Sequence, residues 1–124
     1  MIQLDTHMLV WLASRLVGWL SPLARRLVER ESLQISPMVA LELETLYEAG
    51  RLRSEAGRVL AVVERDYGLS RSQARFAAVI EAARSFAWTR DPFDRLIVAN
   101  AMADAARLIT ADATILANFT GAVW

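Results

Sequence analysis

The chain has 124 residues, of which 55% are hydrophobic, and this is enough for one domain with a sizeable core. It has no cysteine and a single histidine, His7, which excludes a disulfide framework and argues against a zinc site built from nitrogen and sulfur ligands. The formal net charge is zero and lysine is absent, so there is neither a global basic field for nucleic acid nor an ε-amine for P-loop or Schiff-base chemistry. Any metal ion must therefore be held by oxygen atoms.

No apolar run approaches the ~20 residues that a helix needs to cross a bilayer, and the first residues lack the basic start of an export signal. We therefore expect a single cytoplasmic domain, residues 1–124, with no membrane segment.

Hydrophobic periodicity and turn signals divide the chain into alternating strands and helices. Serine followed by proline, at 21–22 and again at 36–37, predicts an N-cap and the first helical residue, and Asp91-Pro92 repeats this pattern. Gly68 to Ser70 reads as a short connection within a helical hairpin. The predicted strands are residues 1–4, 33–36, 108–110 and 122–124, and the predicted helices begin at Thr6, Pro22, Pro37, Ser54 or Glu55, Ser72, Pro92 and Ala113.

Acidic residues follow two of the strands and occur on two of the helices. Asp5 follows the first strand and Asp112 follows the third. Asp91 and Asp94 lie in the first turn of one helix, and Glu42 lies on the flank of the apolar stripe of another. Strands that alternate with helices pair in parallel, so their carboxyl ends meet at one edge of the sheet. We therefore expect these five side chains to converge there.

Each acid also has a simpler structural explanation when it is taken alone. Asp5 and Asp91 are good N-cap residues for the helices that follow them. A glutamate such as Glu42 is more often a surface residue than a ligand. The functional interpretation therefore depends on the acids lying together.

Four or five carboxylates that converge without lysine repel one another unless they are protonated or neutralised. Mg²⁺ or Mn²⁺, as one or two ions, is the natural counter-charge, because such ions bind carboxylate oxygens and leave positions open for phosphate. Such ions polarise a phosphoryl group and lower the pKa of bound water, which indicates phosphodiester chemistry. We expect Thr110 and Thr6 to hydrogen-bond the carboxylates, and Arg90 and Arg95 to contact phosphate, with a surface ion pair as the alternative for the arginines.

Several short segments carry a family pattern. They are Leu4-Asp5-Thr6-His7, Ser36 with Leu41-Glu42-Leu43, Gly50-Arg51-Leu52, Asp91-Pro92-Phe93-Asp94-Arg95-Leu96-Ile97 and Thr110-Ala111-Asp112. As a set in this order they resemble a PIN domain, specifically the VapC-type toxin of bacterial toxin–antitoxin pairs. The resemblance covers nearly the whole chain, and the helical hairpin from Ser54 to Trp88 is its least diagnostic part.

The resemblance implies a three-layer α/β/α PIN-like fold around a central, mostly parallel sheet of four or five short strands. It implies a magnesium- or manganese-dependent endoribonuclease, a homodimeric toxin that a cognate VapB-like antitoxin silences by covering the acidic cleft. Asp5, Glu42, Asp94 and Asp112 match the catalytic, metal-binding quartet of the family. Asp91 matches an acid of less certain role, and is a possible fifth ligand.

Other interpretations remain open at this stage. A lone histidine early in a helix, such as His7, is more often structural, and the metal chemistry does not require it. The separate placement of the tryptophans along the chain favours core and interface roles over a platform for RNA bases. These tryptophans are Trp11, Trp19, Trp88 and Trp124.

Two other classes of protein are the alternatives to a nuclease. A signalling receiver domain also gathers acids around magnesium, but it needs a lysine at the site and this chain has none. The second alternative is a PIN-like module that binds RNA or a partner without cleavage, and the intact acidic set argues against it.

Overall fold

The computed structural model describes all residues from Met1 to Trp124. Five short strands alternate with seven α-helices, and a 3₁₀ helix, η1, follows the first of them. The strands are β1 (Ile2–Leu4), β2 (Leu33–Ile35), β3 (Ser70–Arg71), β4 (Arg107–Ile109) and β5 (Ala122–Val123). The helices are α1 (Thr6–Ala13), η1 (Val17–Trp19), α2 (Pro22–Arg30), α3 (Pro37–Glu48), α4 (Ala56–Tyr67), α5 (Phe76–Arg84), α6 (Pro92–Ala103) and α7 (Ala113–Asn118).

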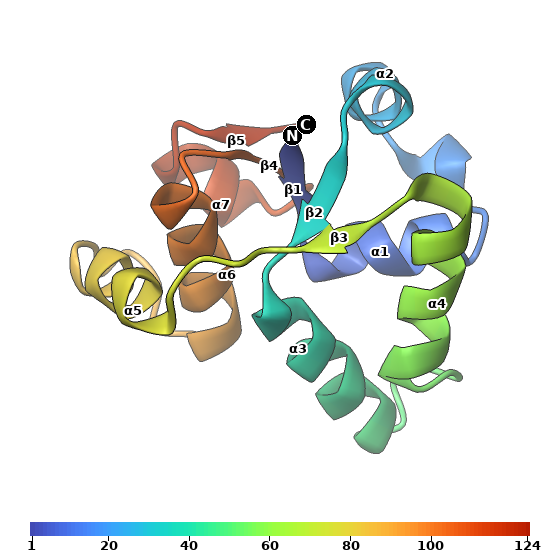
Figure 1. Ribbon diagram of the computed structural model, residues 1–124, viewed down its shortest axis with the longest axis horizontal. Helices are drawn as coiled ribbons and strands as arrows, with labels where there is room; N and C mark the ends of the chain where they lie inside the picture. Colours follow the sequence, from blue (N-terminus) through green and yellow to red (C-terminus); the bar gives the residue numbers. More distant parts are fainter.

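The five strands form one sheet in the order β3-β2-β1-β4-β5, and every neighbouring pair is parallel. The chain runs outward from β1 to β3, returns to β4 beside β1, and continues to β5. Because crossovers between parallel strands are right-handed, this reversal places the crossovers before β3 on one face of the sheet and those after it on the other. In Figure 1, α5, α6 and α7 lie together to the left of the strands, and α1 and α4 lie to the right. The expected three-layer α/β/α architecture is confirmed, with five parallel strands.

The strands are short but deeply buried, as strands covered on both faces should be. Ile2, Leu4, Leu108 and Ile109 on the two central strands have at most a trace of exposed surface. They belong to the main core cluster, to which α1, α3, α4 and α6 also contribute apolar side chains. The core therefore fixes β1 and β4 side by side at the centre of the molecule.

Local signals predicted most of the helix starts correctly. The Ser21 hydroxyl accepts a hydrogen bond from the Ala24 amide, and the Ser36 hydroxyl accepts one from the Met38 amide. In each case proline is the first helical residue, where its missing N–H costs nothing. Gly68 ends α4 in the left-handed region at φ 66°, which favours a residue without Cβ.

Two boundaries differ from the sequence expectation. Residues 70–71 form β3 instead of part of a connection, and α5 begins at Phe76 instead of Ser72. The Ser72 amide donates to the Ile35 carbonyl oxygen at 2.8 Å, and its hydroxyl donates to the Asp104 carboxylate. These tertiary hydrogen bonds hold a polar segment as a strand against its local preference.

A polar network joins the sheet to α6. The Gln3 side-chain amide on β1 donates to Gln34 Oε1 at 2.9 Å and to Asp104 Oδ2 at 2.7 Å. Asn100 Nδ2 donates to the same Asp104 oxygen at 3.0 Å and to the Ser72 hydroxyl at 2.8 Å. One carboxylate oxygen therefore ties together β1, the end of β3 and the last turns of α6.

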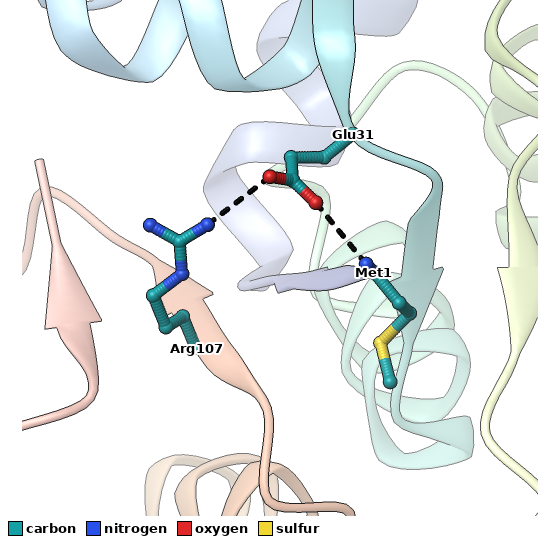
Figure 2. Close-up of polar contacts among 3 residues, drawn as sticks. All are labelled: Met1, Glu31 and Arg107. Atoms are coloured by element: carbon teal, nitrogen blue, oxygen red, sulfur yellow. Dashed lines mark hydrogen bonds and ion pairs between the residues drawn. The ribbon is translucent and has the colours of Figure 1, made fainter.

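An ion-pair cluster holds together the edge of the sheet at which the strands begin (Figure 2). The Glu31 carboxylate lies 3.1 Å from the Met1 amino group and 3.2 Å from Arg107 Nη2. These contacts connect the amino ends of β1 and β4 to the segment that enters β2. The carboxyl edge, by contrast, carries the acidic residues described below.

Candidate active site

The candidate site lies where the direction of the chain through the sheet reverses. β1 and β4 are neighbours, yet the crossovers that leave them lie on opposite faces. Such a switch point leaves a crevice beyond the carboxyl ends of the two strands. Asp5 directly follows β1, and Thr110 and Asp112 follow β4, so the topology brings these residues to the crevice.

Asp5 is both a helix cap and a member of the site. Its Oδ1 accepts hydrogen bonds from the amides of His7 at 3.0 Å and Met8 at 3.3 Å, and its Oδ2 accepts one from the Thr110 hydroxyl. Burial raises the pKa of Asp5, whereas the hydrogen bond from Thr110 acts in the opposite direction. The capping explanation is therefore correct, and it is compatible with a place in the pocket.

Glu42 enters the site from α3 and is held by Thr6 at the start of α1. The Thr6 hydroxyl donates to Glu42 Oε1. Burial raises the pKa of Glu42, and the hydrogen bond from Thr6 partly offsets this effect. Both threonines thus contact carboxylates as expected, Thr110 with Asp5 and Thr6 with Glu42.

Asp91 and Asp112 also combine capping with a place in the site. Asp91 Oδ1 accepts from the amides of Phe93 at 2.9 Å and Asp94 at 3.1 Å at the start of α6. Asp112 Oδ1 accepts from the Ile115 amide at 2.9 Å at the start of α7, and the Asp112 amide itself donates to the Thr110 hydroxyl at 3.0 Å. Their carboxylates are therefore positioned by helix starts.

Asp94 differs because its carboxylate has no hydrogen-bond donor and no ion-pair partner in the protein. Its pKa is raised to about 6, chiefly by burial and then by the negative charges of its acidic neighbours. Those neighbours are Asp91, Asp112, Glu42 and Asp5. These charges act on Asp94 because the five acids lie around one pocket.

All five carboxylates line a single pocket of about 360 Å³. No arginine lines it, and none of the five acids takes part in an ion pair. The remaining lining residues are Thr6, His7, Trp11, Ile97, Ala111 and Ile115. The pocket is therefore an acidic depression without an arginine or a lysine to balance it.

Arg95 does not contribute to this pocket, which corrects the expectation that it contacts phosphate. Its Nε donates to the Ala83 carbonyl oxygen at 2.9 Å and its Nη2 to the Phe86 carbonyl oxygen at 2.5 Å. The guanidinium thus satisfies backbone groups at the end of α5 and fastens α5 to α6. Arg90 is exposed, makes no side-chain hydrogen bond, and lies beside Asp91 outside the pocket lining.

His7 and Trp11 line the pocket although neither was assigned to the site from the sequence. They are four residues apart on α1, so they lie on the same face of the helix. Their positions on the helix that Asp5 caps are the sequence signal that would have found them. Trp11 also contacts Trp19 and Trp124, with ring centroids 5.9 and 5.8 Å apart, although the three are separated in the sequence. Trp11 and Trp124 pack against the core, in line with the core role expected for them.

The donor set fits a hard divalent cation in its chemistry, because every ionisable oxygen in the pocket belongs to a carboxylate. Repulsion among these groups, seen in the raised pKa of Asp94, is what such a cation would relieve. No three of the acidic or histidine side chains are close enough to form a closed ligand set. The carboxylates are gathered around the pocket, and five of their ten oxygens accept hydrogen bonds from the protein.

The sequence from residue 2 to residue 119 matches the family model described as the PIN domain. Since the match spans nearly the whole chain, the chain belongs to the PIN domain family. A comparison with curated proteins gives no significant match. No helix is both long and apolar enough to span a membrane.

Two solved structures share the fold. VapBC2 from Rickettsia felis, bound to a DNA fragment from its promoter, contains a chain with 17% identity and a TM-score of 0.65, and the match covers 99% of this chain and 96% of that one. A toxin–antitoxin complex from Klebsiella pneumoniae contains a chain with 19% identity and a TM-score of 0.66, with coverage of 100% and 97%. At these identities the likeness establishes the fold.

Proposed function

We propose that this chain is a metal-dependent endoribonuclease of the VapC type, the toxin of a toxin–antitoxin pair. The observation that carries the proposal is the pocket in which five carboxylates meet without an arginine or a lysine to balance them. Membership of the PIN domain family supports it further. The substrate is RNA, and the reaction is hydrolysis of an internal phosphodiester bond.

Asp5, Glu42, Asp94 and Asp112 are the residues that would hold Mg²⁺ or Mn²⁺, with Asp91 as a possible further oxygen donor. When bound, one or two such ions polarise the phosphoryl group and lower the pKa of a water molecule. The acids themselves provide negatively charged oxygens at defined positions in the pocket. Asp94 is the best placed to accept a new partner, because no protein donor occupies its carboxylate.

Thr110 and Thr6 act as positioning residues for this set. Thr110 donates to Asp5 and accepts from the Asp112 amide, so it couples the two acids that follow β1 and β4. Thr6 holds Glu42 toward α1. Such contacts orient ligands and commonly contribute about 10- to 100-fold in metal affinity or activity. Arg90 is the remaining arginine proposed to contact phosphate.

The partners follow from the same proposal. The two similar solved structures are described as a VapBC protein and a toxin–antitoxin complex, which supports a VapB-like antitoxin for this chain. We extend the proposal to a homodimer, and to an antitoxin segment that covers the acidic pocket.

The test is cleavage of single-stranded RNA by the purified chain, free of antitoxin, with Mg²⁺ or Mn²⁺. Asp5→Asn and Asp94→Asn should each lower the cleavage rate by at least about 100-fold, since each removes a charged oxygen ligand. Asn retains the capping ability of Asp5, so the fold should persist. Glu48→Gln, which removes an exposed acid of α3 outside the pocket, is the matched control.

Equal cleavage by wild type and both variants would reject the proposed site. If no variant, including wild type, cuts RNA but all bind it, the chain is the non-cleaving PIN-like module. Chelation of the metal with EDTA should abolish cleavage by wild type, and activity that persists in EDTA would contradict metal dependence.

A further inference from the structure

Three of the four tryptophans gather beside the acidic pocket. Trp11 lies on α1, Trp19 ends η1, and Trp124 follows β5 at the same carboxyl edge of the sheet as Asp5 and Asp112. The Trp11 ring contacts Trp19 in an edge-to-face arrangement, with an interplanar angle of 78°, and contacts Trp124 at 59°. The three residues are separated in the sequence, and the fold brings η1 and the end of β5 next to Trp11.

The cluster is continuous with the pocket, because Trp11 belongs to both. Trp11 and Trp124 are half-buried against the core, so they form a fixed base for the cluster. Trp19 has 61% of its surface exposed, and its only aromatic neighbour meets it edge to face instead of lying parallel to it. A largely exposed indole ring therefore contacts Trp11, which itself lines the pocket.

We infer that Trp11, Trp19 and Trp124 form an aromatic platform that stacks an unpaired RNA base beside the phosphodiester bond in the pocket. The inference rests on the proposed function, because it takes the occupant of the pocket to be RNA. Every base has an apolar face that stacks on an indole, whereas the acidic pocket itself repels the backbone. The platform thus supplies attraction that the lining of the pocket lacks.

The platform selects single-stranded RNA over a duplex. Bases in an A-form duplex are already paired and stacked, and side chains reach them poorly, whereas unpaired bases can turn outward onto an aromatic ring. The resulting preference is tolerant of sequence, because stacking does not read the hydrogen-bonding edges of a base.

The test compares two probes of equal charge by fluorescence anisotropy at low salt in EDTA, which prevents metal-dependent cleavage. One is a labelled single-stranded RNA oligonucleotide, and the other is the same backbone with abasic residues. Wild type should bind the first about five- to 100-fold more tightly than the second. Trp19→Ala should remove most of this difference, and Trp19→Phe should restore it, whereas Trp19→Leu, which keeps apolar bulk without a π-face, should not.

Phe76→Ala is the matched control, because Phe76 is 74% exposed on α5 and does not line the pocket. Thermal melts of each variant verify that it is folded. Equal binding of both probes by wild type, or unchanged binding by Trp19→Ala, would overturn the inference. If Trp19→Ala instead changes the oligomeric state on size-exclusion chromatography and leaves RNA binding unchanged, the surface serves protein contacts and the inference is wrong.

Failure of the inference can be told apart from failure of the proposed function. Unchanged RNA cleavage by Asp5→Asn and Asp94→Asn would reject the nuclease site even where Trp19→Ala weakens binding. Loss of cleavage in the acid variants together with unaltered binding by Trp19→Ala would reject only the platform.

Discussion

Asp94 is the acid whose environment favours its charged form least. Asp5, Asp91 and Asp112 each accept hydrogen bonds from backbone amides, and Glu42 accepts one from a hydroxyl. Asp94 receives none, although it is half-buried among the other four. The protein therefore stabilises the charge of its neighbours and leaves that of Asp94 without compensation.

This imbalance predicts how stability depends on pH without metal. The pKa of Asp94 is raised to about 6 in the folded protein, so folding favours its protonated form. The corresponding stabilisation is fully present below the unfolded pKa, near 4, and is lost as the pH rises through 6. Asp94→Asn should therefore be more stable than wild type at pH 7.5, by about 1 to 2 kcal/mol after allowance for solvent screening.

Thermal melts in EDTA measure this effect, and the expected gain is roughly 4 to 8 °C at pH 7.5, falling toward zero near pH 4. Glu48→Gln removes an acid remote from the pocket and should show no such pH-dependent gain. A lower melting temperature for Asp94→Asn at pH 7.5 would mean that Asp94 serves the fold and not the site.

At the scale of the element, the helix starts could be predicted because they depend on adjacent residues. Ser21, Ser36, Asp91 and Asp112 each cap the helix that follows, and the sequence signals for this are local. The parallel sheet could be predicted because the alternation of strands and helices leaves few other arrangements. The meeting of the acids follows from that topology.

What the sequence did not reveal depends on partners distant along the chain. β3 exists because Ser72 bonds to Ile35 and to Asp104, 32 residues away. Arg95 turns toward the end of α5, where it donates to the carbonyl oxygens of Ala83 and Phe86. No periodicity reports such contacts.

The Asp104 network predicts a structural cost that depends on one acceptor. Asp104→Ala would leave Gln3, Asn100 and Ser72 without the oxygen to which all three donate. Because buried donors without partners are costly, we expect a loss of about 2 to 4 kcal/mol in the free energy of unfolding. Urea denaturation followed by circular dichroism measures it.

Two variants make this measurement specific. Asp104→Asn keeps an acceptor oxygen and should lose clearly less than Asp104→Ala. Glu81→Ala breaks an exposed ion pair with Arg84 and should stay within about 0.5 kcal/mol of wild type. Similar losses for Asp104→Ala and Glu81→Ala would show that the network contributes little to joining β3, β1 and α6.

Across the whole molecule, the two edges of the sheet differ in charge balance: the acid at the amino edge is paired, whereas those at the carboxyl edge are not. At the amino edge, Glu31 is matched by the Met1 amine and Arg107. At the carboxyl edge, the five pocket acids have no ion-pair partner, although net charge over the chain is zero. Balanced composition thus coexists with a local excess of negative charge at the switch point, where open α/β sheets place their ligands.

If the pocket binds a metal ion, as we propose, metal binding and folding are two parts of one equilibrium. An ion that binds the folded pocket and not the unfolded chain should stabilise wild type by about 2.7 kcal/mol at 100 times its dissociation constant, on the order of 10 °C in melting temperature. The rise with Mn²⁺ or Mg²⁺ should be larger at pH 7.5 than at pH 5, because below pH 6 the ion must displace a proton from Asp94. Calorimetry at constant ionic strength measures both.

Asp5→Asn and Asp94→Asn should each reduce this metal-dependent rise, whereas Glu48→Gln should retain it. Asp94→Asn is the more informative of the two, because the same substitution is expected to stabilise the protein in EDTA. The order of stability should therefore invert: the variant melts above wild type without metal, and wild type melts above the variant at saturating metal. General screening by divalent ions would raise the melting temperatures of all of these proteins by the same amount. If the order of stability does not invert, the result contradicts a metal site at Asp94.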